Sequence, residues 1–288
     1  MTLLQSLSLH GGENLSVVVV DNRKDHNFTS DDNLLEELMR THFDSERLII
    51  IRHPHGGLSS ARNRGAQTSE SEFLYFLDDE CLVTRTSMEA INNLMRSGAT
   101  AAFGGYSDLS LNRPVLPGEG TAKRTLTGGE QLLGAVDLMS GGNLLVRNEA
   151  FKSLGGFNEQ LGRGSGAIEL AEDSEFAFRL LQLPETTIMF DPNMEVFHGA
   201  RSDKSSIRWR LRESFHKGRA GVFLRPMRMK MISQGAVTES SVKASSLRMS
   251  FKSIYRSALN PRAINLIFVF LGAAYQMSLS IRLRRKGR

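Results

Sequence analysis

The stretch Ser16-Val17-Val18-Val19-Val20-Asp21-Asn22 decides the fold, because an unbroken β-branched run leads directly into a polar turn. Such a run is typical of a strand that is buried on both faces of a parallel sheet. Two further apolar runs, over 47–51 and 73–77, have the same character, and the second leads into Asp78-Asp79-Glu80. We therefore predict three strands of one sheet, each ending in polar residues.

Helical patterns alternate with these strands. One covers 31–41, where Ser30 can cap the helix, and another covers 59–67. The alternation indicates an α/β domain with a Rossmann-like, mostly parallel central sheet flanked by helices. Further along, the same patterns predict a helix over 88–96, a strand over 100–106, a glycine-interrupted strand over 138–146, helices over 148–154 and 172–181, and strands over 186–190 and 194–197.

The composition is that of an ordinary folded protein, with 288 residues, 40% of them hydrophobic and 23% charged. The only cysteine, Cys81, cannot form an internal disulfide, and residues 1–10 lack the basic and apolar blocks of a signal peptide. We therefore expect a reducing, cytoplasmic location.

Charge divides the chain near residue 200. Residues 1–200 hold 16 Lys and Arg against 28 Asp and Glu, whereas residues 201–288 hold 20 against 3. A basic tail of this kind either meets an anionic partner or stays solvated, and nucleic acid, an anionic membrane face or a phosphorylated lipid would each be a suitable partner. Because the tail has no recognisable motif for reading bases, we expect no nucleic acid. The predicted domains are therefore 1–200 and a basic helical tail, 201–288, that associates with membranes.

An apolar stretch over 264–281 lies within this tail, between Arg262 and a second basic run at 282–286. Asn265 and Gln276 interrupt it, which makes it marginal for a spanning helix. A single span near 264–281 and a helix lying in the interface or on the domain are both open alternatives. In either case we expect the protein at the inner face of the cell membrane.

Acidic residues follow two of the predicted strands, at Asp21 and at Asp78-Asp79-Glu80. In open α/β sheets the ligand site lies outside the carboxyl ends of the strands. A carboxylate there can accept a hydrogen bond from a base or ribose, and an acidic cluster can hold a hard cation that neutralises a diphosphate leaving group. The alternative is that these acids are solvated turn residues.

Three other features are candidates for chemistry. Glu172-Asp173 opens a helix after a glycine-rich loop, so that one carboxylate can take a proton from an acceptor hydroxyl, although acids also favour helix starts for electrostatic reasons alone. Arg62 follows glycines and serines in an arrangement suited to phosphate. His198 follows a predicted strand and is either a metal ligand or a structural residue. Zinc is not expected, since Cys81 has no second thiolate beside it.

In their order and spacing, these motifs resemble the family 2 glycosyltransferases of bacteria. Three segments, 17–22, 57–65 and 76–80, are similar to the donor half of that family, expected over about 1–106. Gly141-Gly142-Asn143 with the four residues that follow, Phe151, 155–159 and Glu172-Asp173 are similar to its acceptor half, over about 130–200. The resemblance covers about 1–200 and implies the GT-A fold.

The resemblance also implies a role for each matching position. The donor-binding set is Asp21, Asn22, Arg62, Asp78 and Asp79. The acceptor-binding set is Gly142, Asn143 and Glu172. Asp78, Glu80 and His198 would hold a divalent metal, Mn²⁺ or Mg²⁺, and Asp173 would be the general base.

Together these roles imply a metal-dependent inverting transfer. A sugar would pass from a nucleotide-diphosphate sugar to a hydroxyl of a polysaccharide or lipid-linked acceptor. Two departures from the family pattern stand out: Glu80 replaces an aspartate, and residues 3–7 already look like a helix, so the usual first strand is missing. The rival hypothesis is therefore a catalytically silent GT-A-like binding or scaffold protein at the membrane.

Overall fold

The computed structural model describes residues 3–23, 37, 40–44, 46–54, 56–108, 113–116, 124–126, 139–198 and 207–233. Most of the predicted helix over 31–41 lies outside these residues, and so does the apolar stretch over 264–281. All statements below concern the described residues.

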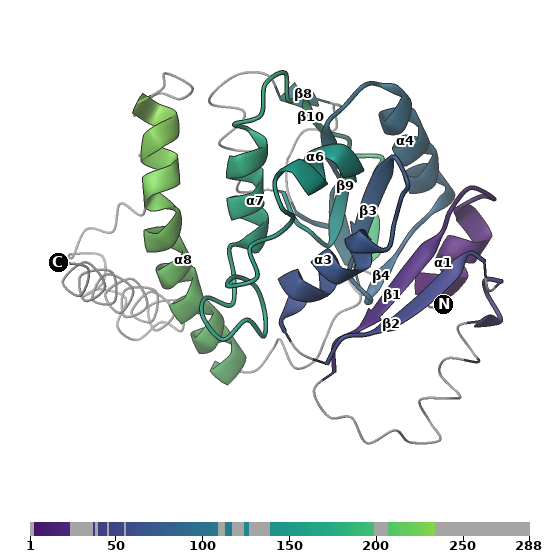
Figure 1. Cartoon of the computed structure of the whole chain (residues 1–288), viewed down its shortest axis with the longest axis horizontal. Coiled ribbons are helices and arrows are strands. Elements are labelled where there is room, and N and C mark those ends of the chain that lie inside the picture. Colours follow the sequence, from purple (N-terminus) through teal and green to yellow (C-terminus); the bar gives the residue numbers. More distant parts are fainter. Residues whose placement is uncertain are drawn as a thin grey trace.

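Helices and strands are mixed along the chain, and several described strands follow one another without a described helix between them (Figure 1). The helices are α1 (Leu3–His10), α3 (Leu58–Gln67), α4 (Arg85–Arg96), α6 (Asn148–Ser153), α7 (Glu172–Leu180) and α8 (Ile207–Ser233). The strands are β1 (Val17–Asp21), β2 (Leu48–Arg52), β3 (Phe73–Leu77), β4 (Cys81–Leu82), β5 (Ala101–Phe103), β6 (Tyr106–Asp108), β7 (Arg113–Leu116), β8 (Arg124–Leu126), β9 (Asn143–Arg147), β10 (Ile188–Phe190) and β11 (Val196–His198). The α/β class is confirmed.

The expectation of a mostly parallel sheet needs correction, because the sheets are mixed. β1 and β2 form a parallel pair, while a five-stranded sheet has the order β3-β9-β5-β10-β8 and a four-stranded one the order β4-β11-β6-β7. β9 runs antiparallel to both of its neighbours, β3 and β5. Parallel neighbours need a crossover, usually a helix, whereas β9 runs back between two strands that precede it in the chain.

Two strand predictions also change. The strand predicted over 100–106 divides into β5 and β6, which belong to different sheets. The break lies at Gly104, where a Cβ would stand 1.8 Å from the carbonyl oxygen of Met194, so only glycine permits this crossing. The strand predicted over 138–146 begins only at Asn143, because Gly141 and Gly142 form a turn before it.

The core lies on both faces of the five-stranded sheet. On one face α6 and α7 pack through a group of phenylalanines, with ring centroids of Phe151, Phe157 and Phe176 between 4.9 and 5.4 Å apart. On the other face α4 buries Met88, Ile91 and Leu94. Burial of such side chains contributes about 1.5–3 kcal/mol each, and the packing holds the ends of β3 and β9 in place.

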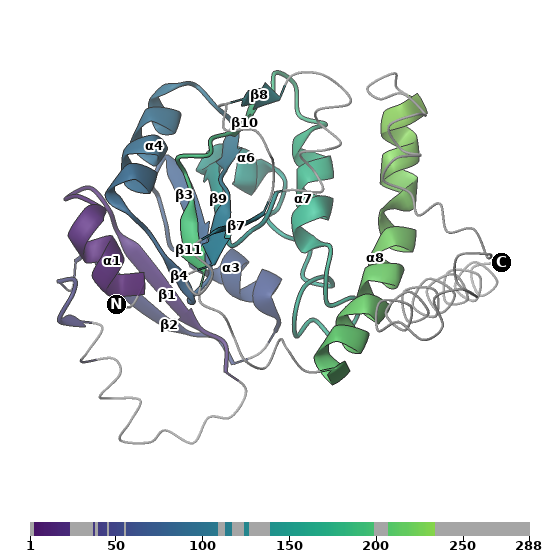
Figure 2. The ribbon, with the colours of Figure 1, turned by 180° about the vertical axis from the view of Figure 1, so that it is seen from behind.

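α8 packs against the phenylalanine side of the domain. Its Leu224 and Met231 are 5% exposed and belong to the same cluster as α7. Figures 1 and 2, from opposite sides, show α8 alongside α7 at the edge of the molecule. The boundary near residue 200 stays a prediction, as does the tail beyond residue 233. Among the described helices, none combines the length and apolarity needed to cross a membrane.

Candidate active site

Arg62, on the second turn of α3, lies at the centre of the site. Its guanidinium donates to Oδ1 of Asp78 at 3.0 Å and to Oδ1 of Asp173 at 3.3 Å. A third carboxylate, that of Glu172, lies 3.6 Å away. Only 9% of the Arg62 side chain is exposed. One buried cation therefore contacts both sides of the predicted site. Asp78, directly after β3, is predicted to bind the donor, and Glu172 and Asp173, at the start of α7, are predicted to act on the acceptor.

Burial and mutual charge set the proton affinities of this cluster. Burial raises the pKa of Glu172 to about 8, and the neighbouring charge of Asp173 adds to the effect while Arg62 opposes it. Burial likewise raises the pKa of Asp173, opposed by Arg62. Desolvation alone would lower the pKa of Arg62, but the three carboxylates outweigh it and the pKa is raised. The guanidinium stays charged, while Glu172 and Asp173 take protons more readily than exposed carboxyls.

A glycine turn allows the charged groups to meet. A Cβ on Gly141 would lie 2.5 Å from Nη1 of Arg62 and 2.6 Å from Oδ1 of Asp173. A Cβ on Gly142 would lie 2.4 Å from Oδ2 of Asp78. A side chain at either position would therefore displace the charged groups of Arg62, Asp173 or Asp78 from their present contacts. The backbone of the turn also hydrogen-bonds to Asp173 from Gly141, which stabilises the carboxylate.

The loop before α7 closes over the start of α3. The N–H of Leu58 donates to the carbonyl of Arg163 at 2.8 Å, and the hydroxyl of Ser59 donates to the carbonyl of Leu161 at 2.7 Å. Gly57 permits this approach, since a Cβ there would lie 2.5 Å from the carbonyl oxygen of Arg163. Ala171, with φ of 82°, then turns the chain into α7. The loop thus fixes where Glu172 and Asp173 begin.

The predicted metal residues lie at the end of β3. Asp78, Asp79 and Glu80 supply consecutive carboxylate oxygens, the hard donors that Mg²⁺ and Mn²⁺ prefer. In β11, the backbone of His198 pairs in register with Cys81, the residue after Glu80. The side chain of His198 is outside the described set. Within the described side chains no three possible ligands converge, although the donor set is chemically suited to such a cation.

Asp21 and Asn22 lie at the end of β1, as predicted. The carboxylate of Asp21 accepts two hydrogen bonds from the guanidinium of Arg23, at 2.9 and 2.7 Å. Its backbone carbonyl accepts from the N–H of His53, which follows the end of β2. The ends of β1 and β2 are therefore tied together locally, through contacts distinct from those of Arg62.

Asn143 does not fit its predicted role in acceptor binding. It is fully buried, and its amide donates to the carbonyls of Gly105 and Met194 at 3.0 and 2.8 Å. Its oxygen accepts from the hydroxyl of Tyr75 at 2.9 Å. All of its polar side-chain atoms therefore hold the crossing of β5, β6 and β9 together, and we reassign Asn143 to the structure of the fold. Gly142 and Glu172 remain at the site.

Tyr106 belongs to the site although no sequence pattern singles it out. Its hydroxyl donates to Oγ of Ser140 at 2.8 Å, next to the glycine turn. A Cβ on Gly142 would lie 2.9 Å from this hydroxyl, close to Asp78. Burial raises the pKa of Tyr106, so it remains protonated. A tyrosine at the start of a short strand has no sequence signal that distinguishes it from a core aromatic.

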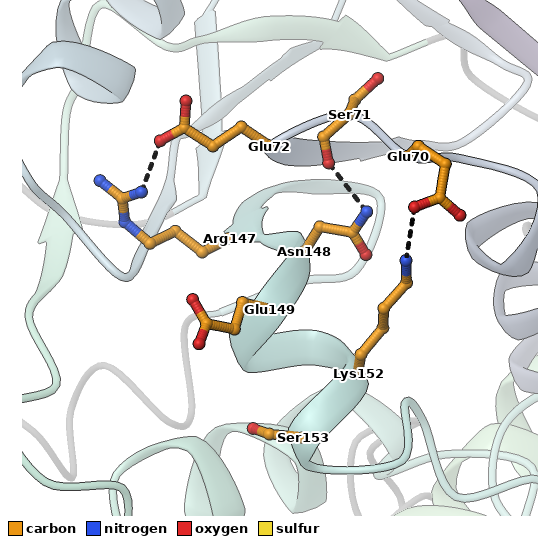
Figure 3. A pocket seen from close by; sticks show the side chains of 8 residues that line it. All are labelled: Glu70, Ser71, Glu72, Arg147, Asn148, Glu149, Lys152 and Ser153. Carbon is orange, nitrogen blue, oxygen red and sulfur yellow. Dashed lines mark hydrogen bonds and ion pairs between the residues drawn. The ribbon is translucent and has the colours of Figure 1, made fainter.

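A hollow of about 630 Å³ lies at the opposite end of β3 (Figure 3). Its lining consists of Glu70, Ser71, Glu72, Arg147, Asn148, Glu149, Lys152 and Ser153. Charged side chains in it pair with one another, with Arg147 2.6 Å from Glu72 and Lys152 3.6 Å from Glu70. This hollow is open and lies at the far end of the strand from Asp78, so we assign the chemistry to the Arg62 cluster.

Comparison with known proteins indicates the family of the chain. A family model described as Glycosyl transferase family 2 matches residues 2–155. An uncharacterized glycosyltransferase of Haemophilus influenzae is 25% identical over 195 residues, 64% of this chain and 58% of that protein. Succinoglycan biosynthesis protein ExoM of Rhizobium meliloti is 28% identical over 181 residues, 59% of this chain and 54% of that protein. The chain thus spans little more than half the length of these curated relatives.

Solved structures share the fold at lower identity. The mannosyltransferase PcManGT from Pyrobaculum calidifontis, in complex with GDP-Man and Mn²⁺, has a TM-score of 0.57 and 15% identity, over 96% of this chain and 82% of that one. S. aureus TarS 1-349 in complex with UDP-GlcNAc has a TM-score of 0.54 and 15% identity, over 96% and 87%. These likenesses confirm the GT-A fold.

Proposed function

The chain belongs to glycosyl transferase family 2 and is a glycosyltransferase, and on this premise we propose a metal-dependent, inverting transfer from a nucleotide-diphosphate sugar to an acceptor hydroxyl. The observation that carries the proposal is the Arg62 cluster, in which the donor-side Asp78 and the acceptor-side Asp173 share one buried guanidinium. This contact brings the proposed donor and acceptor residues close together, and a direct transfer depends on such proximity of its two substrates.

On the donor side, Asp78 and Glu80 are the residues that would hold the divalent cation, with His198 as a further ligand, and Asp79 would contact the donor. The Mn²⁺ bound together with GDP-Man in the PcManGT complex supports a divalent cation here. Held by these residues, such a cation would supply the positive charge that neutralises a diphosphate leaving group. Asp21 and Asn22 would contact the base, and Arg62 the nucleotide.

On the acceptor side, Asp173 is the proposed general base. Its raised pKa makes it a better proton acceptor than an exposed aspartate, and its contact with Arg62 fixes its direction. The acceptor O–H would give its proton to Asp173 as the oxygen attacks the anomeric carbon, and the bond to the nucleoside diphosphate breaks on the opposite face. A single displacement of this kind inverts the anomeric centre.

The proposed acceptor is a polysaccharide or lipid-linked glycan at the inner face of the cell membrane. The ExoM relative is a succinoglycan biosynthesis protein, and the basic tail of this chain suits an anionic membrane surface. The protein would then be peripheral, with α8 and the residues after it near the lipid.

Turnover of nucleotide sugars tests the proposal. The full chain is incubated with UDP- and GDP-sugars, with Mn²⁺, with Mg²⁺ and with a chelator, and released nucleoside diphosphate is measured. We expect release from at least one donor, with loss in the chelator. Absence of turnover from every donor would favour the silent scaffold.

A further inference from the structure

Arginines gather where the loop before α7 meets α8. Arg163 comes from the loop, and Arg208, Arg212 and Arg219 come from α8. Spacings of about four and seven residues place the three helix arginines on one side of α8. Arg163 and Arg212 are exposed to solvent, and 66% of the Arg212 side chain is accessible. We call these four residues the arginine patch.

The contacts of the patch hold it against the loop. The guanidinium of Arg163 lies 6.0 Å from the ring centroid of Trp209, and Arg219 donates to the carbonyl of Ala167. Arg212 pairs with Glu169, the only acidic residue between 161 and 171. The region where the loop meets α8 is therefore rich in arginine, with one carboxylate supplied by residues 161–171.

The backbone of the loop adds hydrogen-bond donors to this charge. The left-handed conformation recurs at every second residue, at Gly162, Gly164 and Gly166, with φ of 90°, 77° and 80°. Within the described part of the chain, the N–H groups of Arg163, Gly164 and Gly166 make no hydrogen bond. Successive N–H groups near left-handed residues are a recurrent source of anion-binding donors.

The patch lies next to the acceptor side of the Arg62 cluster. A Cβ on Gly162 would be 3.2 Å from the carboxyl carbon of Glu172, which belongs to the cluster. Arg163 is the next residue in the chain after Gly162. Figures 1 and 2 both show the loop before α7 between α3 and α8. An anion held here would be adjacent to the acceptor and separate from Asp78 and Glu80.

We propose that the arginine patch binds a phosphate or diphosphate group carried by the acceptor. Arginine is suited to this ligand because its planar guanidinium gives paired, charge-assisted hydrogen bonds to phosphate oxygens. The proposal rests on the proposed function and adds to it a phosphorylated acceptor, as distinct from a neutral glycan. Bulk phospholipid headgroups would offer the same chemistry, so the experiment must separate the two sources.

Binding is measured first without turnover. Trp209 is the only tryptophan of the chain and touches the patch, so its fluorescence reports a ligand there. The full chain is titrated with inorganic pyrophosphate in a chelator, and calorimetry gives an independent affinity. We expect saturable binding that Arg163→Gln weakens by about tenfold or more, because a hydrogen bond to a charged group contributes ~1.5–3 kcal/mol.

Arg225→Gln is the matched control. Arg225 is exposed on the same helix, and its position about thirteen residues after Arg212 turns it to the other side of α8. This variant should bind pyrophosphate like the unmodified chain. Equal losses in both variants, or no loss in Arg163→Gln, would overturn the proposal.

Two further measurements separate the sources of phosphate. Arg163→Gln should co-sediment with vesicles containing phosphatidylglycerol as the unmodified chain does, while its KM for a polyprenyl-diphosphate-linked sugar rises. Its hydrolysis of donor without acceptor should be unchanged. Loss of vesicle binding with pyrophosphate binding intact would assign the patch to the membrane surface and refute the proposal. Absence of donor hydrolysis in the unmodified chain would instead refute the proposed function. The pyrophosphate titrations would still test whether the arginine patch binds phosphate groups.

Discussion

The two ends of β3 carry the same kind of interaction in different surroundings. After the carboxyl end, Asp78 pairs with Arg62, whose side chain is 9% exposed. Before the amino end, Glu72 pairs with Arg147, and here 72% and 32% of the two side chains are exposed. Distance does not separate the pairs, since the exposed one is the shorter, at 2.6 Å against 3.0 Å.

Burial makes the difference between them. At the buried end, several carboxylates from two elements share one cation and the pKa values of Glu172 and Asp173 are raised. At the exposed end, each charge has water as an alternative partner, so the pairs contribute ~0–1 kcal/mol. A site with altered proton affinity therefore needs both the pairing and the exclusion of water, and of the two ends only that of Arg62 has both.

The largest effect should come from removing the proposed base at the buried end. Asp173→Asn keeps the shape of the side chain, but an amide cannot accept the acceptor proton. We expect transfer to fall by about 10²–10⁴-fold, with nucleotide binding retained, as measured by product formation and calorimetry. Glu72→Gln, at the exposed end, is the control and should keep full activity. Transfer by Asp173→Asn at the normal rate would remove Asp173 from the mechanism.

Loss of the shared cation should have the next largest effect. Arg62→Gln leaves Asp78, Glu172 and Asp173 close together without their counter-charge. Removing one partner of a buried pair costs about 3–5 kcal/mol, which urea unfolding at about pH 7 would detect. Arg62→Lys keeps the positive charge but lacks the forked guanidinium, so its unfolding free energy should lie between those of Arg62→Gln and the parent. A stability for Arg62→Gln within experimental error of the parent would mean that water already solvates the cluster.

Sequence patterns were sufficient for the elements that depend on local residues. The apolar run of β1 and the acids after β3 could be located from sequence alone, as could the helix that begins at Glu172. Each is encoded within a short segment of the chain. The split between β5 and β6 was not predicted, because Gly104 is required by a contact with Met194, which is distant in the chain.

The assembly of the site was the part that local patterns could not provide. Arg62 and Asp173 are 111 positions apart, and their contact depends on how α3, α7 and the glycine turn pack together. The same limit explains Asn143: a glycine-glycine-asparagine motif does not reveal that the asparagine will be fully buried with every polar side-chain atom bonded. Burial depends on the tertiary fold, and it is the degree of burial that distinguishes the ion pairs at the two ends of β3.

A smaller effect should depend on pH. The pKa of Glu172 rises from 4.5 to about 8 on folding, so between these values the folded chain keeps a proton that the unfolded chain has lost. Stability contributed by this group is therefore full below pH 4.5 and declines as the pH rises to about 8. Glu172→Gln removes the titration. Relative to the parent, its unfolding free energy should increase as the pH rises from about 5 to about 8.

Urea unfolding at both pH values measures this difference. Glu149→Gln, which also replaces a carboxylate by an amide but at an exposed position in the hollow, is the matched control. A constant difference between Glu172→Gln and the parent across the range would show that Glu172 ionises as an ordinary surface acid.

The smallest effect should come from the exposed end itself. Arg147→Gln breaks the pair with Glu72, yet the two charges regain water and the stem of the side chain can still cover Phe73, over whose ring the guanidinium lies at 4.6 Å. The change in unfolding free energy should stay within about 1 kcal/mol, with unchanged transfer. A loss comparable to that of Arg62→Gln would mean that pairing, and not burial, determines the strength of these contacts, and the distinction between the two ends of β3 would fail.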